Sequence, residues 1–333
     1  MKYNLKRNKP YELVLTIDLD KTDLDLYLEE ARKRLANELK LDGFRQGKVP
    51  AEIAKDKLDQ NQVLETAFNL AFRQSFADVL SKEKLEVIET GDFKVKDNSS
   101  EKLVYSVSLI VFPECKLKDY KNIKVAKKET GVSEGEVEAV LESIRKSRAA
   151  SGAVPELNDE FAKSLGRFDN VAELKANVSE GLKEEKNMKE SQRVQAAVLD
   201  KIAEGTRIDP PPVLVIRQLD QMILDLDSDL HRQGMELNLF LAKIKKTEVE
   251  LREEWKKKAE LLVRKALILK EIARLEKIEV GEEEVKGRVN DFLGNFPNLA
   301  EAEKKIDLVK LADQIRQILL NQKVLVFLER EAL

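Results

Sequence analysis

The feature that most constrains this chain is the absence of any convincing strand alternation after residue 132. From there on, apolar residues recur at helical spacing, and the segments are bounded by N-cap residues, glycines or prolines. The predicted helices cover residues 136–150, 171–205, 211–234, 237–244, 248–278, 282–296 and 299–333. Asn170 is the predicted N-cap of the helix at 171, and Thr247 with Glu250 caps the helix at 248. Charged residues make up 36% of the chain and aromatic residues 5%, which favours long helices with solvated faces.

The first 112 residues show a mixed pattern instead. Residues 11–19 alternate apolar and polar side chains, which predicts a half-buried strand. Thr22, with Asp25 three residues later, is the predicted N-cap of the next helix. Helices are predicted over 22–41 and 62–85, with a short one starting at Pro50, and strands over 92–97 and 102–112. Together these elements indicate an α+β unit over residues 1–112.

Residues 113–150 are predicted to link this unit to the rest of the chain. Within them, residues 122–128 read as one more strand, and Ser133 with Glu136 forms a capping box that begins a helix. The remainder, residues 151–333, is predicted to be helical. The predicted fold class is therefore an α+β N-terminal domain followed by an elongated all-α domain with helical arms, in a multi-domain, mostly α chain.

Many of the predicted helices have polar residues on most of their faces, which implies arms with thin cores. Such arms expose more apolar area than a compact globule, and exposed apolar surface usually marks a binding surface. The candidate contact residues for an unfolded polypeptide are Met222, Ile223, Phe240, Leu293 and Phe296. For each of them, ordinary packing between helices is the alternative.

The composition excludes several kinds of site. With 59 basic and 62 acidic residues the formal net charge is -3, so no global field attracts nucleic acid, and DNA is not an expected partner. Cys115 is the only cysteine and His231 the only histidine, so neither a disulfide framework, a zinc site nor a serine protease triad is expected. We expect no cofactor and no metal. The sequence shows neither a signal peptide nor an apolar run of about 20 residues, so no membrane is expected and the predicted location is the cytoplasm.

One loop remains as a candidate docking site, at residues 43–50 with the sequence GFRQGKVP. It is not a phosphate-binding P-loop, because only three residues separate its glycines and no Ser or Thr follows Lys48. Phe44 offers an apolar anchor, and Arg45 and Lys48 place cations beside it. This combination suits docking to an anionic surface such as a ribonucleoprotein. The alternative is a plain connection between two helices.

The loop resembles the ribosome-docking signature of the bacterial trigger factor family. By that resemblance, Gly43, Phe44, Arg45, Gln46, Gly47 and Lys48 would contact protein and rRNA around the ribosomal exit tunnel. Many family members carry a second cation where this chain has Gln46, which implies somewhat weaker or less salt-sensitive docking. Residues 105–125, 154–166 and 208–215 also resemble the family, so the likeness covers nearly the whole chain.

The resemblance implies an ATP-independent, ribosome-associated chaperone for nascent and unfolded polypeptides, with the family's roles in folding, protein export and cell division. Members usually carry a peptidyl-prolyl isomerase domain where this chain has only Ser151 to Ala153. Three residues cannot hold a folded domain, so we expect no enzymatic activity. Whether that domain was lost naturally or by engineering stays open, as does homodimer formation off the ribosome. The alternative function is a cytosolic helical scaffold that binds a folded partner without visiting the ribosome.

Overall fold

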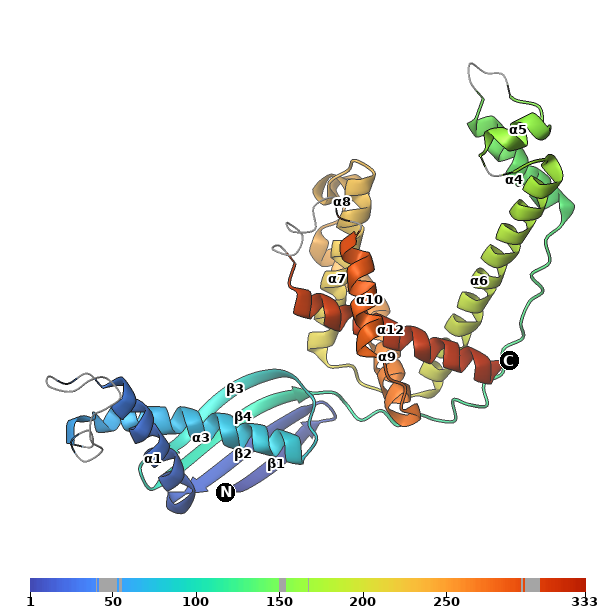
Figure 1. The fold of residues 1–333 in the computed structure, drawn as a ribbon. Helices are drawn as coiled ribbons and strands as arrows, with labels where there is room; N and C mark the ends of the chain where they lie inside the picture. The colour runs from blue at the N-terminus through green and yellow to red at the C-terminus, as the bar shows by residue number, and fades with distance from the viewer. Residues whose placement is uncertain are drawn as a thin grey trace. The chain divides into compact units, whose positions relative to one another are not determined.

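The computed structural model describes the whole chain except residues 40, 42–52, 54–55, 150–153, 167, 295 and 297–305. The described part is mostly helical, with one antiparallel sheet near the N-terminus (Figure 1). Its strands are β1 (Lys2–Lys9), β2 (Glu12–Asp20), β3 (Val87–Asn98) and β4 (Lys102–Val111). The helices before residue 210 are α1 (Lys21–Glu38), α3 (Gln60–Lys82), α4 (Glu134–Ser147), α5 (Asp159–Ser164) and α6 (Val171–Gly205). Those after it are α7 (Pro212–Arg232), α8 (Leu237–Ile244), α9 (Glu248–Glu276), α10 (Glu282–Gly294) and α12 (Leu308–Ala332).

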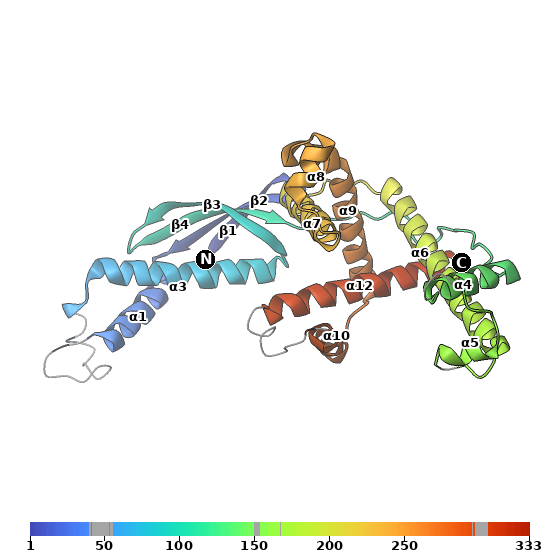
Figure 2. The ribbon, with the colours of Figure 1, turned by 90° about the horizontal axis from the view of Figure 1, so that it is seen from above.

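The N-terminal sheet has the strand order β1-β2-β4-β3, and α1 and α3 cover one of its faces (Figure 2). In β2 every second side chain is buried, which is the alternation that the sequence predicted. The register sets Leu15 opposite Val107 and Ile17 opposite Tyr105, so these side chains share the helix-covered face. Burial of one face fixes this register, because a slip of one residue would turn the core side chains to the other face.

The aromatic residues of α3 pack beside this core. Phe72 lies 5.5 Å from Phe76 and 5.2 Å from Tyr105, measured between ring centroids. The Tyr105 hydroxyl is 2.7 Å from the Ser75 hydroxyl, which also donates to the backbone carbonyl of Ala71. Burial raises the pKa of Tyr105 to about 12. The phenol is therefore a neutral core group, and its polar end is satisfied.

The strand β1 was missing from the sequence prediction. It offers only Tyr3 and Leu5 to the core, and the other residues of the strand are exposed, so its alternation is weak. Pairing with β2, with Leu5 opposite Leu15, supplies what the local sequence lacks.

The predicted N-cap at Thr22 is wrong. Helix α1 begins earlier, because Asp20 accepts from the Asp23 amide at 3.2 Å and Asp23 accepts in return from the Asp20 amide. This reciprocal pair satisfies two backbone donors that a cap at Thr22 would leave unpaired.

The predicted strand over residues 122–128 is also wrong, since no regular element occurs between β4 and α4. The segment is extended, but its backbone groups pair mainly with side chains of α6 instead of with a neighbouring strand. An apolar alternation such as Ile123 and Val125 indicates an extended chain, but not what the chain pairs with.

The helical part confirms most of the predicted caps. Asn170 accepts from the Glu173 amide, Glu136 accepts from the Ser133 amide, and Glu250 accepts from the Thr247 amide. The last helix was predicted from residue 299, of which 299–305 lie outside the described residues. Helix α12 itself begins at Leu308 with Asp307 as N-cap.

The residues group into two compact units, each discontinuous in sequence. One contains residues 1–115 and 208–264, and the other contains residues 116–207 and 265–333. Small separate clusters form the cores of the helical segments: Val137, Leu141, Phe161, Ala162 and Leu174 in one, Ile223, Leu241 and Leu251 in a second, and Leu293 and Leu311 in a third. The boundaries predicted from the sequence, 1–112, 113–150 and 151–333, stay a prediction.

Candidate functional site

The predicted docking residues, Gly43 to Lys48, lie outside the described residues. The described chain on either side is anchored in the N-terminal core: Leu58 is buried there, and Leu39 packs against the same cluster. The Leu39 amide donates to the Leu35 carbonyl at 3.0 Å, and Asp59 caps α3 by accepting from the Asn61 amide at 2.9 Å. The described residues that flank the loop in sequence therefore belong to the N-terminal core.

The predicted contact residues for an unfolded polypeptide fall into three environments. Ile223 and Leu293 are buried in helix-helix clusters, where a bound peptide could not reach them without rearrangement. Met222 and Phe240 are half-buried. Phe296 is exposed, and its ring lies 5.4 Å from that of Phe292, which is also exposed. Of the five, Phe296 is the one that presents an open apolar surface.

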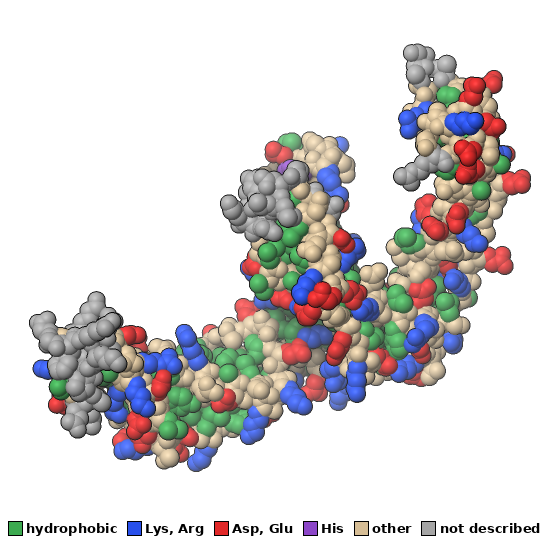
Figure 3. Space-filling view, viewed as in Figure 1, with side chains coloured by type: hydrophobic (Ala, Val, Ile, Leu, Met, Phe, Trp, Pro, Cys, Tyr) green, Lys and Arg blue, Asp and Glu red, His purple; other side chains and the backbone are tan. Residues whose placement is uncertain are grey.

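Other large apolar side chains, which were not among the predicted contact residues, are exposed on the described helices. They are Ile216 and Leu224 on α7, Leu239 on α8, Val249 on α9, Phe292 on α10, and Val309 and Ile318 on α12. Figure 3 shows hydrophobic patches of this kind at the surface among the charged side chains. Helical periodicity alone does not distinguish an exposed apolar residue from a core residue. The helix that packs against it must also be known.

A shallow pocket of about 260 Å³ lies between α10 and α12. Val285, Val289 and Ala312 contribute its apolar lining, and Glu282 and Arg316 are among its polar residues. The Arg316 Nη2 atom pairs with Glu282 Oε1 at 2.9 Å, so these charges neutralise each other. The pocket is large enough for one aliphatic or aromatic side chain.

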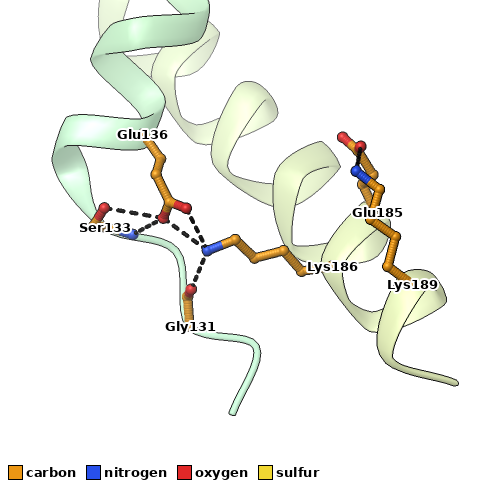
Figure 4. Close-up of polar contacts among 6 residues, drawn as sticks. All are labelled: Gly131, Ser133, Glu136, Glu185, Lys186 and Lys189. Carbon is orange, nitrogen blue, oxygen red and sulfur yellow. Dashed lines mark hydrogen bonds and ion pairs between the residues drawn. The ribbon is translucent and has the colours of Figure 1, made fainter. Parts of the chain in front are cut away.

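The start of α4 is tied to α6 through one carboxylate (Figure 4). Glu136 accepts from the amide and hydroxyl of Ser133, and its Oε1 atom lies 2.7 Å from the Lys186 Nζ atom. The same ammonium donates to the Gly131 carbonyl at 2.7 Å. The hydrogen bond from Lys186, assisted by those from Ser133, lowers the pKa of Glu136 to about 2.

Further along α6, polar side chains hold the extended segment before α4, which runs beside this helix in Figure 1. Glu190 accepts from the Lys128 amide at 2.6 Å. Arg193 donates to the Ala126 carbonyl at 2.7 Å, and Lys201 donates to the Lys124 carbonyl at 2.9 Å. We call Lys186, Glu190, Arg193 and Lys201 the α6 ladder.

Glu190 and Arg193 of the α6 ladder form an ion pair. Glu190 is buried and bonds to the guanidinium of Arg193 at 2.8 Å. That contact, together with the Lys128 amide, lowers the pKa of Glu190 to about 2. The carboxylate is therefore ionised at neutral pH and acts purely as an acceptor.

A second junction fixes the linker to the ends of α9 and α12. The Tyr120 hydroxyl donates to Glu276 Oε1 at 2.5 Å, and the Lys121 Nζ atom lies 2.7 Å from the same oxygen. Desolvation, together with Glu276, raises the pKa of Tyr120 to about 12. Lys121 also lies 5.9 Å from the centroid of the Phe327 ring. The linker is thus held by side chains of α6, α9 and α12.

The described residues contain no cluster of His, Cys, Asp or Glu that could hold a metal ion. His231 is exposed, and its Nδ1 atom lies 2.8 Å from the Asp227 carbonyl, a contact that raises the pKa of the imidazole. Within the same described ranges, no helix is long and apolar enough to cross a membrane.

Two family models match the chain. The model described as bacterial trigger factor protein matches residues 1–144, and the model of the trigger factor C-terminus matches residues 170–329. Trigger factor from Brevibacillus brevis is 24% identical over 386 residues, covering 88% of this chain and 90% of the relative. Trigger factor from Clostridium kluyveri is 23% identical over 426 residues, covering 97% of both chains. Both alignments are longer than the 333 residues of this chain, so both relatives contain sequence without a counterpart here.

A solved structure reported under "Promiscuous Substrate Recognition in Folding and Assembly Activities of the Trigger Factor Chaperone" shares the fold, with a TM-score of 0.57 at 18% identity over 100% of both chains. The two family models together span nearly the whole chain, with only residues 145–169 between them and a few at the C-terminus unmatched. By these matches, the chain belongs to the bacterial trigger factor family.

Proposed function

We propose that the chain is an ATP-independent, ribosome-associated chaperone that holds nascent and unfolded polypeptides and delays their misfolding. Membership of the family supports the chaperone role. The observation that carries the holding mechanism is the exposure of large apolar side chains on helices with thin cores. Polypeptides that have not folded expose apolar side chains of their own, which these surfaces can cover.

Weak, distributed contacts would explain how a client is released without nucleotide hydrolysis. Partial burial of one exposed apolar side chain contributes on the order of 1 kcal/mol. Several such contacts hold a segment, yet each breaks independently, so a client that begins to bury its own apolar residues leaves. The α10–α12 pocket would add a place for one larger side chain.

Docking near the exit tunnel would use the loop at residues 43–48. Its Phe44 supplies an apolar anchor, while Arg45 and Lys48 supply charge for rRNA phosphates or acidic side chains. The core-anchored residues on either side, Leu39 and Leu58, support a fixed base for that loop.

Changing the exposed residues Phe292, Phe296, Val309 and Ile318 to serine is expected to weaken the holding of clients. Each change removes exposed apolar surface, and none of the four side chains is a core residue of the described helices. We expect the concentration that halves aggregation of a denatured client to rise about tenfold, since tenfold corresponds to about 1.4 kcal/mol. Light scattering of the diluted client measures this.

A matched control carries serine at four exposed polar positions of the same helices: Glu283, Lys310, Gln317 and Gln322. This variant should suppress aggregation as well as the unmodified chain does. If both variants lose suppression of aggregation equally, holding of clients does not depend on these apolar side chains. If the unmodified chain does not suppress aggregation, the holding role is excluded.

We further propose that the chain has no peptidyl-prolyl isomerase activity. The matched family models leave only residues 145–169 between them, fewer than a folded domain of about 50 residues needs. A prolyl peptide mixed with the chain should therefore relax at the uncatalysed rate, over tens to hundreds of seconds at 25 °C. A rate that grows with the concentration of the chain would contradict this.

A further inference from the structure

All four residues of the α6 ladder bond to backbone groups of the linker, and Lys186 also pairs with the Glu136 carboxylate at the start of α4. Lys186 donates to the Gly131 carbonyl, Glu190 accepts from the Lys128 amide, and Arg193 and Lys201 donate to the carbonyls of Ala126 and Lys124. On the other side of the segment, the Val125 amide donates to the Ala332 carbonyl of α12 at 3.4 Å. Every residue except proline offers the same amide and carbonyl groups.

The spacing of the ladder fits an extended chain of any sequence. From Lys124 to Gly131 the linker takes seven steps, which span about 23 Å at about 3.3 Å per residue. From Lys201 back to Lys186 the helix takes fifteen steps, which span about 22 Å at about 1.5 Å per residue. The two lengths agree, so an antiparallel extended chain meets the four side chains in turn.

Two side chains of the segment add contacts of their own: Thr130 Oγ1 donates to Asn187 Oδ1 of α6 at 2.5 Å, and Lys124 Nζ donates to the Glu331 carbonyl of α12 at 3.1 Å. Ile123 and Val125 are half-buried, whereas Ala126, Lys127, Lys128 and Glu129 are exposed. The exposed positions make the segment accessible from solvent, and the polar contacts along it can exchange with water. Unlike the contacts of Thr130 and Lys124, the four backbone contacts of the α6 ladder require no particular linker side chain.

We propose that the α6 ladder is a binding site for extended polypeptide backbone, in which the linker is a displaceable resident and an unfolded client segment is the second occupant. The identity of that second occupant rests on the proposed function, whereas the ability of the α6 ladder to bind extended backbone rests on its contacts with the linker. Because the linker is tethered, its effective concentration at the site is in the millimolar range, so a client competes only weakly while the linker is bound.

A fluorescent peptide with the sequence of residues 122–131 tests this by polarisation against the full chain. Lys128→Pro removes the amide that donates to Glu190 and still permits an extended chain, so it loosens the resident linker. We expect this variant to bind the peptide at least fivefold more tightly than the unmodified chain. Adding Glu190→Ala and Arg193→Ala to it should remove that gain.

Two further peptides test whether the site binds the backbone groups of a peptide or its side chains. A peptide of the same composition in scrambled order should bind the Lys128→Pro variant as well as the original peptide does. A peptide N-methylated at the position of Lys128 lacks the amide proton and should lose at least fivefold in affinity. Circular dichroism of each protein variant checks that α6 stays helical.

Equal affinity of the unmodified chain and the Lys128→Pro variant would overturn the proposal, as would a gain that survives removal of Glu190 and Arg193. Neither result touches the holding role, because suppression of client aggregation is measured separately on the unmodified chain. Failure of that suppression, with peptide binding intact, would instead remove the proposed function and leave the backbone site in place.

Discussion

Replacing Phe44, Arg45 and Lys48 together with alanine is expected to abolish co-sedimentation of the chain with vacant and translating bacterial ribosomes. The change removes the proposed aromatic anchor, and single anchors of this kind often contribute 2 kcal/mol or more, about a thirtyfold change in affinity. It also removes two cations, which should reduce the slope of log affinity against log salt by about 1 to 2. Sedimentation at several salt concentrations measures both effects.

A control with matched chemistry lies on the same N-terminal unit. Leu26, Lys33 and Lys96 are exposed, so changing all three to alanine removes one apolar side chain and two cations outside the loop sequence. This control should sediment like the unmodified chain. If the loop variant also sediments normally, the loop is a connection between helices, and a scaffold that binds a folded partner becomes the better description.

Leu15→Ala is expected to destabilise the N-terminal sheet by about 2–5 kcal/mol, because the side chain is fully buried between the sheet and its helices. Hydrogen exchange of the β4 amides, which pair with β2, should accelerate accordingly. Leu26→Ala makes the same chemical change at a residue that is 72% exposed on α1, and it should shift stability by less than about 0.5 kcal/mol. Similar acceleration in both variants would mean that β2 does not form the core of this unit.

Helix caps were predictable from the sequence, whereas the pairing of extended segments was not. The caps at Asn170, Ser133 and Thr247 were predictable, because each requires only a side chain three residues from a backbone amide. The strand β1 was not, because its weak alternation becomes a strand only through pairing with β2. Residues 122–128 show the opposite case. Their alternation correctly predicts an extended chain, but the chain pairs with helix α6 and not with a strand.

The candidate contact residues show the same limit within a single helix. Ile223 and Leu224 are adjacent apolar residues of α7, and only Ile223 was predicted as a contact residue. The structure buries Ile223 against Leu241 and Leu251 and leaves Leu224 exposed. Helical periodicity fixes which residues share a face, whereas the position of the neighbouring helix decides which face is covered.

The sequence by itself determined the helical class of the chain after residue 132 and the α+β character of its start, and it predicted the docking motif at Gly43 to Lys48, because periodicity, caps and short motifs are local. Only the tertiary structure decided which apolar side chains remain exposed and that the linker lies along the α6 ladder. Burial and backbone pairing depend on residues far away in the sequence. The Lys128 amide and its acceptor Glu190 are 62 positions apart, a separation at which no local pattern carries information.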